Sequence, residues 1–192
     1  VQEQLGFGNR LFLTGAVRAD DNSAFGEKFD RVYYPKGSIS YVVSEEPAVA
    51  GFFDAIRAGD FKLRAAYGQA GRSPGPYDAL RTYTSSRVVN GNGTVTSGII
   101  PAAPGNENLK PERGTELELG FDASFLDNRL GAEFTYNDKR TSDALISIGN
   151  APSLGYTGTR FINFAELRNS GFEMALRGTP VQTRNFAWDA TL

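Results

Sequence analysis

The chain has 192 residues, of which 20 are basic and 22 acidic, and its formal net charge is −2 at pH 7. This balance, without any dense basic run, disfavours nucleic-acid binding. Cysteine and histidine are absent, which excludes disulfides and thiolate metal sites and removes the commonest general base. No apolar run approaches the roughly 20 residues of a transmembrane helix, so a membrane could be entered only as strands.

The first third of the chain alternates apolar and polar residues in three runs, the period that is typical of strands. The predicted strands cover residues 10–20, 34–44 and 61–71. Pro35 marks an edge of the second, because proline cannot donate to a strand ladder. A polar loop is expected at 21–32. Within 45–60 the apolar spacing becomes helical, which predicts a short amphipathic helix closed by Gly59.

Two strictly alternating runs lie within residues 106–136, NENLKPERGTELELGFDASFLDNRLGAEFTY, and only residues 126–129 separate them. Their apolar residues fall on one face, at Leu117, Leu119, Phe121, Ala123, Phe125, Leu130, Ala132, Phe134 and Tyr136. Each run has about ten residues, about the length that a tilted strand needs to cross the hydrocarbon of a bilayer. The pattern predicts a β-hairpin of two membrane-length strands.

The remaining segments place long and short connections at opposite ends of the expected sheet. Irregular stretches are predicted at 72–113 and 140–165, a sixth strand at 169–178, and a seventh at 186–190 after a short connection. Connections after the first, third and fifth strands are long, those after the fourth and sixth are short, and the one after the second is intermediate. Because antiparallel strands put odd connections at one end, this arrangement is typical of outer-membrane barrels with long extracellular loops.

The distribution of charge over the two strand faces also favours a membrane barrel. Charged residues recur on the polar face, which is expected to line a wet lumen, at Arg18, Lys62, Arg64, Glu116, Glu118, Asp122, Glu133, Glu173 and Arg177. The apolar face carries almost no charge between strand ends, where Arg or Lys would cost about 2 to 4 kcal/mol at mid-bilayer. Alternation alone also fits a soluble β-sandwich, so the loop lengths and the charges carry the distinction.

Five segments of the chain resemble a known family. NENLKPERGTELELGFDASFLDNRLGAEFTYNDKRTSDAL resembles the barrel of TonB-dependent outer-membrane receptors. Four further segments are similar to the SusC/RagA branch of this family, namely RADDNSAFGEKF, YYPKGSISYVVSEEP, FKLRAAYGQAG and ELRNSGFEMAL. The resemblance implies an all-β fold, an antiparallel transmembrane β-barrel of about 22 strands, of which about seven lie here. The chain begins without Met and ends inside an alternating run, so we expect residues 1–192 to be part of the barrel domain, without plug domain, signal peptide or C-terminal strands.

The resemblance further implies a function and partners. Receptors of this branch import nutrients such as oligosaccharides or peptides across the bacterial outer membrane, which the barrel crosses many times. Energy comes from TonB, which acts through the plug, and a SusD-like surface lipoprotein covers the extracellular mouth. The expected partners are therefore outer-membrane lipid, TonB, this lipoprotein and the nutrient, with no cofactor, metal or catalytic residue. Lumenal charges would pair with the plug or with water.

Aromatic side chains in the long loops are the candidates for contact with the nutrient, since they offer stacking surfaces for sugars or apolar side chains. They are Tyr77, Tyr83, Tyr156, Phe161 and Phe164.

The sequence also leaves two alternative functions and one candidate metal site. A soluble all-β ligand-binding module shares the strand pattern, and an all-β glycoside hydrolase could use Glu116 and Glu118, whose Cα atoms would lie about 7 Å apart on one strand face. Oxygen-rich residues at 20–23 lack the spacing of a calcium loop and are typical of turns.

Overall fold

The structure is a computed structural model that describes residues 1–22, 31–156 and 158–192. These residues form one eight-stranded antiparallel sheet, in the order β1-β2-β3-β4-β7-β8-β9-β10, and a separate two-stranded ribbon, β5-β6. The main strands are β1 (Gln2–Phe7), β2 (Leu11–Asp20), β3 (Val32–Val42), β4 (Ala58–Arg72), β7 (Glu112–Phe125), β8 (Leu130–Gly149), β9 (Thr159–Gln182) and β10 (Ala187–Thr191). The ribbon consists of β5 (Thr82–Val89) and β6 (Val95–Ala103).

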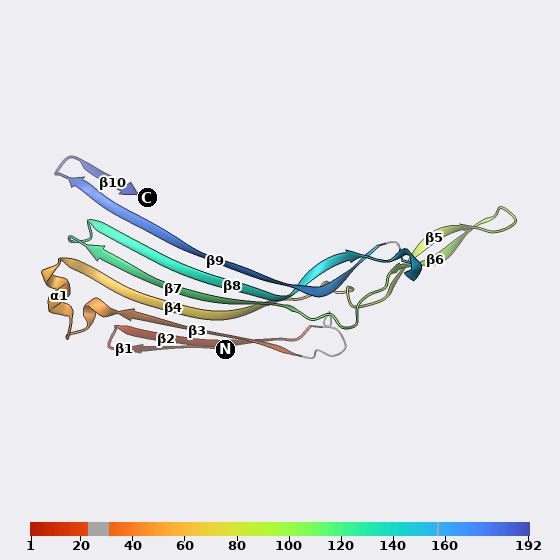
Figure 1. Ribbon diagram of the computed structural model, residues 1–192, viewed down its shortest axis with the longest axis horizontal. Helices are drawn as coiled ribbons and strands as arrows, with labels where there is room; N and C mark the ends of the chain where they lie inside the picture. The colour runs from red at the N-terminus through yellow and green to blue at the C-terminus, as the bar shows by residue number, and fades with distance from the viewer. Residues whose placement is uncertain (23–30, 157) are drawn as a thin grey trace.

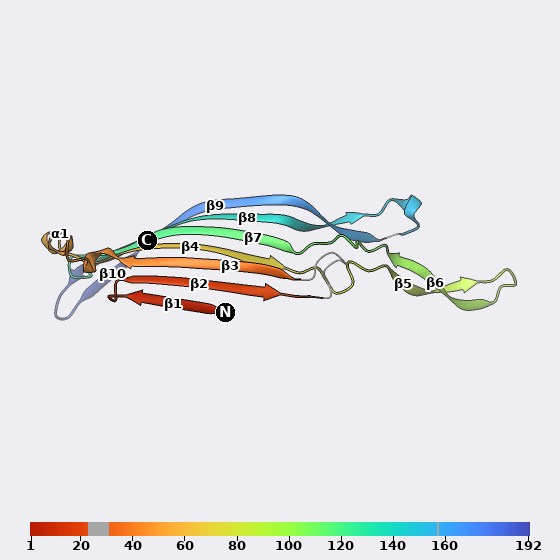
Figure 2. The ribbon, with the colours of Figure 1, turned by 90° about the horizontal axis from the view of Figure 1, so that it is seen from below.

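The main strands lie side by side in a single curved layer (Figure 1, Figure 2). Tight turns join β1 to β2, β7 to β8 and β9 to β10 at one end of the layer, where η1 (Val43–Glu45) and α1 (Ala50–Ala55) also lie (Figure 1). The ribbon projects from the other end, beyond η2 (Pro152–Leu154) in the connection from β8 to β9 (Figure 1). Short and long connections therefore gather at opposite ends, as the sequence predicts.

The layer has almost no interior of its own. Among the described residues the buried apolar side chains are Val32, Tyr34, Ala79, Leu109, Ala123 and Ala144, together with Pro74 and Pro111. Large apolar side chains on the strands remain exposed, including Leu119 at 43% and Phe172 at 75%. A β-sandwich would cover such a face with a second sheet, whereas the second sheet of the described residues, the β5-β6 ribbon, projects from the end of the main one (Figure 1). The sandwich alternative is therefore not the fold of these residues.

The predicted strands are found, with different lengths. The runs at 10–20 and 61–71 correspond to β2 and β4, and the hairpin within 106–136 is β7-β8. Pro35 pairs with Val17 of β2, whereas the pairing of β3 with β4 begins only at Lys36. The proline thus lies where β3 needs no N–H towards β4. Residues 23–30 of the predicted loop at 21–32 lie outside the described residues.

Two sequence predictions about element boundaries are wrong. The main sheet of the described residues has eight strands where about seven were expected, and the additional one is β1. The stretch predicted to be irregular at 72–113 contains the ribbon, and most of 140–165 belongs to β8 and β9. The helix is only the six residues of α1, and Gly59 lies in β4 rather than closing it. No helix among the described residues is long and apolar enough to span a membrane.

Candidate functional site

The strand register sorts the side chains of the main sheet into an apolar and a polar face. Residues that lie directly opposite one another in neighbouring strands share a face. One such row, from β1 to β9, consists of Leu5, Leu13, Ile39, Ala65, Leu119, Tyr136 and Phe172. The next row towards the tight turns consists of Phe7, Leu11, Tyr41, Leu63, Phe121, Phe134 and Met174. The apolar face therefore runs unbroken across seven strands.

Stacked phenylalanines reinforce this apolar face near the tight turns. Ring centroids are 5.7 Å apart between Phe53 of α1 and Phe61, 6.0 Å between Phe61 and Phe121, and 5.7 Å between Phe121 and Phe134. Phe172 continues the series on β9, 6.5 Å from Phe134. The series therefore joins α1 and four strands on one face. Each cross-strand aromatic pair contributes about 0.2 to 1 kcal/mol.

The residues predicted to face the lumen all lie on the opposite face, by strand alternation and register. Asp122 is the centre of their largest ion-pair cluster. Its carboxylate lies 2.8 Å from Lys62 Nζ and 3.2 Å from Arg64 Nε. Arg64 also donates to the Thr135 hydroxyl at 2.8 Å, which brings β8 into the cluster. This cluster joins β4, β7 and β8 across the polar face.

Further ion pairs extend along this face in both directions. Arg177 of β9 lies 2.8 Å from Glu133 of β8, and Lys139 lies 3.5 Å from Glu116. All these side chains are about one third or more exposed, so each pair contributes little stability by itself. Their arrangement instead gives the polar face a row of both charge signs, which a charged or polar body inside a barrel can contact.

A hydrogen-bonded clamp centred on Asn163 of β9 lies beyond the polar and apolar rows, at the end with the long connections. The Asn163 amide oxygen accepts from the Lys110 backbone N–H at 2.9 Å. Its amide nitrogen donates to the Lys110 carbonyl at 2.9 Å and to the Asp143 carbonyl at 2.7 Å. Asn106 adds a donor to the Phe161 carbonyl at 3.1 Å, and Leu109 between them is fully buried. The segment before β7 is thereby tied to the outer part of β8-β9.

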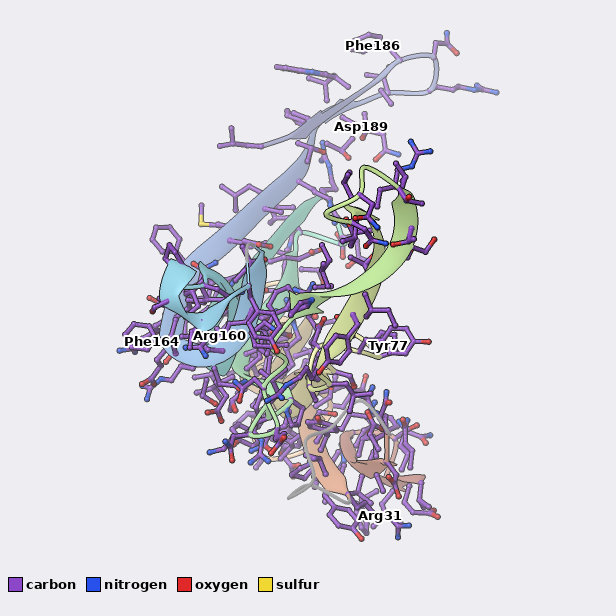
Figure 3. All side chains as sticks on the ribbon, turned by 90° about the vertical axis from the view of Figure 1, so that its right-hand side faces the viewer. Arg31, Tyr77, Arg160, Phe164, Phe186 and Asp189 are labelled. Atoms are coloured by element: carbon purple, nitrogen blue, oxygen red, sulfur yellow. The ribbon has the colours of Figure 1, made fainter. Side chains whose placement is uncertain are left out.

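The structure does not gather the five loop aromatics into one site. Figure 3 shows Phe164 and Tyr77 on opposite sides of the sheet, and both are largely exposed. Phe164 lies at the irregularity in the pairing of β8 with β9, between Asn163 and Ala165. Tyr83 lies on the ribbon, whereas Tyr156 follows η2. No ring contact joins any two of the five in the described part of the chain.

The ribbon carries an apolar stripe that sequence analysis missed. Pairing places one set of side chains on one face, namely Tyr83, Ser85, Arg87, Val89, Val95, Ser97, Ile99 and Pro101. Its large apolar members are all more than half exposed, with Ile99 at 78%. A two-stranded ribbon is marginally stable in water unless something packs on it. Asn-Gly at 90–91, followed by Gly93 in the left-handed conformation at φ 77°, was the signal for this hairpin.

The remaining candidate chemistry finds little support. Glu116 and Glu118 share the polar face, but Glu116 is already paired with Lys139. Among the described residues no three acidic side chains gather closely enough to hold a metal ion. Ser23 of the oxygen-rich stretch lies outside the described residues.

The main sheet has a continuous apolar face and a charged opposite face, with tight turns at one end and long connections at the other. Together these features define a wall segment of an outer-membrane β-barrel. The family model described as TonB dependent receptor-like, beta-barrel, matches residues 1–192, and the chain belongs to this family. Barrels of this family lie in the outer membrane.

Curated relatives and solved structures agree with the SusC/RagA resemblance. The chain is 31% identical over 186 residues to TonB-dependent receptor P26 of Formosa agariphila, covering 96% of this chain and 18% of that protein. It is 28% identical over 188 residues to TonB-dependent receptor SusC of Bacteroides thetaiotaomicron, covering 94% and 18%. The chain thus spans about a fifth of the length of these relatives.

Solved structures show the same fold. The RagAB peptide importer in its closed-closed state superposes with a TM-score of 0.85 at 21% identity, over 99% of this chain and 20% of that one. The siderophore receptor PirA from Pseudomonas aeruginosa gives 0.62 at 19% identity, over 100% and 33%. The barrel fold and the expected resemblance to the SusC/RagA branch are confirmed.

Proposed function

We propose that residues 1–192 form part of the barrel domain of a longer receptor that binds a nutrient at the cell surface and imports it with energy supplied by TonB. The observation that carries this proposal is the division of the sheet by register into an apolar and a charged face. A wall between lipid and a wet lumen needs both faces at once. The family membership and the small share of the relatives that the chain covers support its place in a longer protein.

Two strand edges support a closed barrel in the whole receptor. In the described residues β1 pairs only with β2, and β10 pairs only with β9. Unpaired backbone groups cannot be left in hydrocarbon, where each costs several kcal/mol. Strands from the rest of the receptor would therefore pair with both edges and carry the barrel past these residues in each direction.

The polar face would meet the plug. Its ion pairs are exposed and contain both signs, so a plug inside the lumen could exchange partners with them at little cost. The cluster around Asp122 and the Glu133–Arg177 pair are the contacts that we assign to this role. An enzymatic role is not part of the proposal, because the relatives named above are receptors and an importer.

The nutrient is proposed to be an oligosaccharide or a peptide. A peptide is what the structurally similar RagAB importer transports. Tyr77 lies opposite to Phe164 across the sheet (Figure 3). All five loop aromatics, Tyr77, Tyr83, Tyr156, Phe161 and Phe164, remain proposed ligand contacts, and we rank Tyr77 ahead of Phe164.

A SusD-like surface lipoprotein is proposed as the partner, and the ribbon stripe supports it. The ribbon is the element that projects farthest from the wall (Figure 1, Figure 2). Its stripe combines exposed Tyr, Ile and Val side chains with Arg87, and no acidic residue occurs between Asp78 and Glu107. Tyr and Arg are enriched where protein interfaces bind most strongly. A protein seated over the barrel mouth, with an acidic group facing Arg87, fits this surface.

Replacing Tyr83 and Ile99 by serine in the full-length receptor is expected to reduce retention of the co-expressed lipoprotein at least tenfold, because two apolar anchors are lost. The measurement is co-purification of the two proteins in detergent. The matched control is Val88→Ser with Ile100→Ser, which changes the opposite face of the ribbon. Equal loss in both double variants would show that ribbon stability, rather than the stripe, determines retention.

Membrane fractionation and uptake test the proposed function as a whole. The full-length receptor is expected in the outer-membrane pellet, resistant to extraction without detergent. A strain that lacks the receptor is expected to lose growth on one of two supplied nutrient pools, maltooligosaccharides or tryptic peptides, and to regain it with the intact gene. A receptor that stays in the supernatant after ultracentrifugation contradicts the barrel, and unchanged growth on both pools contradicts the proposed nutrient class.

A further inference from the structure

The apolar face changes to a charged one over two residue pairs along β8 and β9. Tyr136 lies opposite Phe172, Asp138 opposite Ser170, and Arg140 opposite Arg168, all on the same face by strand alternation. The two arginines thus lie about 13 Å along the strands from the pair of Tyr136 and Phe172. They lie towards the end of the sheet from which the long connections extend.

The pairing of Arg140 with Arg168 is unfavourable by itself, since like charges directly opposite destabilise a sheet. Asp138 offsets this repulsion. Arg168 donates to both of its carboxylate oxygens, from Nε at 2.9 Å and from Nη2 at 3.0 Å. Arg140 Nη2 lies 3.8 Å from one of the same oxygens. One carboxylate therefore orients two guanidinium groups, and the three residues keep a net charge of +1.

Exposure leaves the arginines accessible while their shared partner is covered. The Asp138 side chain is only 15% exposed, whereas those of Arg140 and Arg168 are 56% and 57% exposed. A guanidinium has five N–H donors, so both groups keep donors directed away from Asp138. Farther out on this face, Arg113 and Glu166 add one charge of each sign, and the acidic Glu3 in the row of Asp138 lies five strands away on β1.

The surroundings place this trio at a hydrocarbon boundary. Tyr67 lies in the same row as Asp138, and the Gln69 amide donates to its hydroxyl at 3.2 Å. Tyrosines with a wet hydroxyl and an apolar ring are typical of the membrane interface. At the tight-turn end, the ion pair of Arg10 with Glu46, 3.3 Å apart, is neutral. The trio therefore carries a local excess of positive charge, whereas the Arg10–Glu46 pair does not.

We propose that Arg140 and Arg168, oriented by Asp138, bind the phosphate of an anionic lipid headgroup in the outer leaflet. Guanidinium groups match phosphate oxygens in a bidentate fashion, which ammonium groups do not. The trio faces sideways into the membrane rather than into the lumen, so a lipid meets it without entering the barrel. This inference rests on the proposed placement of the chain in the outer membrane.

Native mass spectrometry of the full-length receptor tests the site with three probes: dioleoyl phosphatidylglycerol, dioleoyl phosphatidylcholine and inorganic phosphate. The receptor is expected to retain phosphatidylglycerol about fivefold more than phosphatidylcholine, since one net positive charge near a membrane surface has an effect of this size. The double variant R140Q/R168Q is expected to lose the preference. The matched control R18Q/R177Q removes two arginines from the opposite face and is expected to keep it.

Folding is checked by heat-modifiable migration on gels, and R168K serves if the double variant does not fold. It keeps the charge but loses the bidentate geometry, so at least a twofold loss of preference is expected. Equal retention of the two lipids, equal loss in R18Q/R177Q, or displacement of phosphatidylglycerol by millimolar inorganic phosphate overturns the lipid assignment. A receptor that imports its nutrient but shows no preference fails only this inference, whereas one absent from the outer membrane fails the proposed function.

Discussion

Leu119→Arg is expected to destabilise the folded receptor by about 2 to 4 kcal/mol, the cost of an arginine on the lipid side of a barrel at mid-bilayer. Leu119 belongs to the continuous apolar row and lies between Ala65 and Tyr136. Its side chain is 43% exposed in the sheet, and neither neighbour in its row carries a charge that could pair with an arginine. An arginine there reaches water only by distorting the bilayer or the strand.

The adjacent residue on the same strand supplies the control. Glu118 shares backbone neighbours with Leu119 but faces the opposite side, in a row with Thr14, Ser38, Ala66, Asn137 and Gly171. Glu118→Arg is expected to cost less than about 1 kcal/mol, since an exposed lumenal charge remains hydrated. Guanidinium titration of both variants of the full-length receptor, folded in phosphatidylcholine vesicles, measures the difference. Equal destabilisation would mean that the two faces are not lipid and lumen.

The faces could be predicted from sequence because alternation is a local signal. Each strand residue points to the side opposite its neighbours. The apolar face could therefore be predicted from residues 117–125 alone, without knowledge of any partner strand. The charged residues between them followed by the same rule, and Lys62, Arg64 and Asp122 do meet on one face. The role of these residues against a plug stays a prediction.

Strand ends were harder to predict, because pairing rather than alternation sets them. β8 continues through the polar residues 137–143 as far as Gly149, since β9 supplies a backbone partner almost throughout. A register shift after Thr141 also breaks the alternation there. β1 was missed because only Leu5 and Phe7 of its six residues are large and apolar. In all these cases the information lies in a neighbouring strand.

The helix was overestimated for a related reason. The apolar spacing in 45–60 is helical, yet Arg57 adopts a left-handed backbone at φ 51° and the chain enters β4 at Ala58. Pairing of β4 with β7 and the packing of Phe61 on Phe121 compete with further helical turns. A six-residue helix is too short to be stable by propensity, so tertiary contacts decide where it ends.

Side-chain to backbone contacts between distant segments could not be predicted at all, and the clamp at Asn163 is the main example. Its amide serves Lys110, 53 positions earlier, and Asp143, 20 positions earlier. Asp143 has a left-handed backbone, with φ 54°, at the irregularity where β8 bends relative to β9. Nothing in the sequence around Asn163 indicates either partner. Only the fold places these three backbone groups around one amide.

Asn163→Ala is expected to loosen the segment before β7 strongly while leaving the barrel folded. Three hydrogen bonds are lost, each contributing about 0.5 to 1.5 kcal/mol, so local opening of residues 104–111 should become easier by about 2 to 4 kcal/mol. Hydrogen exchange at the Lys110 amide, whose acceptor is removed, should then accelerate at least 30-fold. Deuterium uptake by peptides that cover this segment, measured by mass spectrometry on the full-length receptor, provides the test.

Asn169→Ala provides the comparison, since Asn169 is on the same strand and its side chain makes no hydrogen bond among the described residues. Its exchange at 104–111 should match that of the unmodified receptor. The same segment ends the long connection that carries the β5-β6 ribbon. Asn163→Ala should therefore also weaken retention of the lipoprotein, although Asn163 does not lie on the ribbon stripe. Unchanged exchange at Lys110 would show that buried Leu109 and Pro111 hold the segment without the amide.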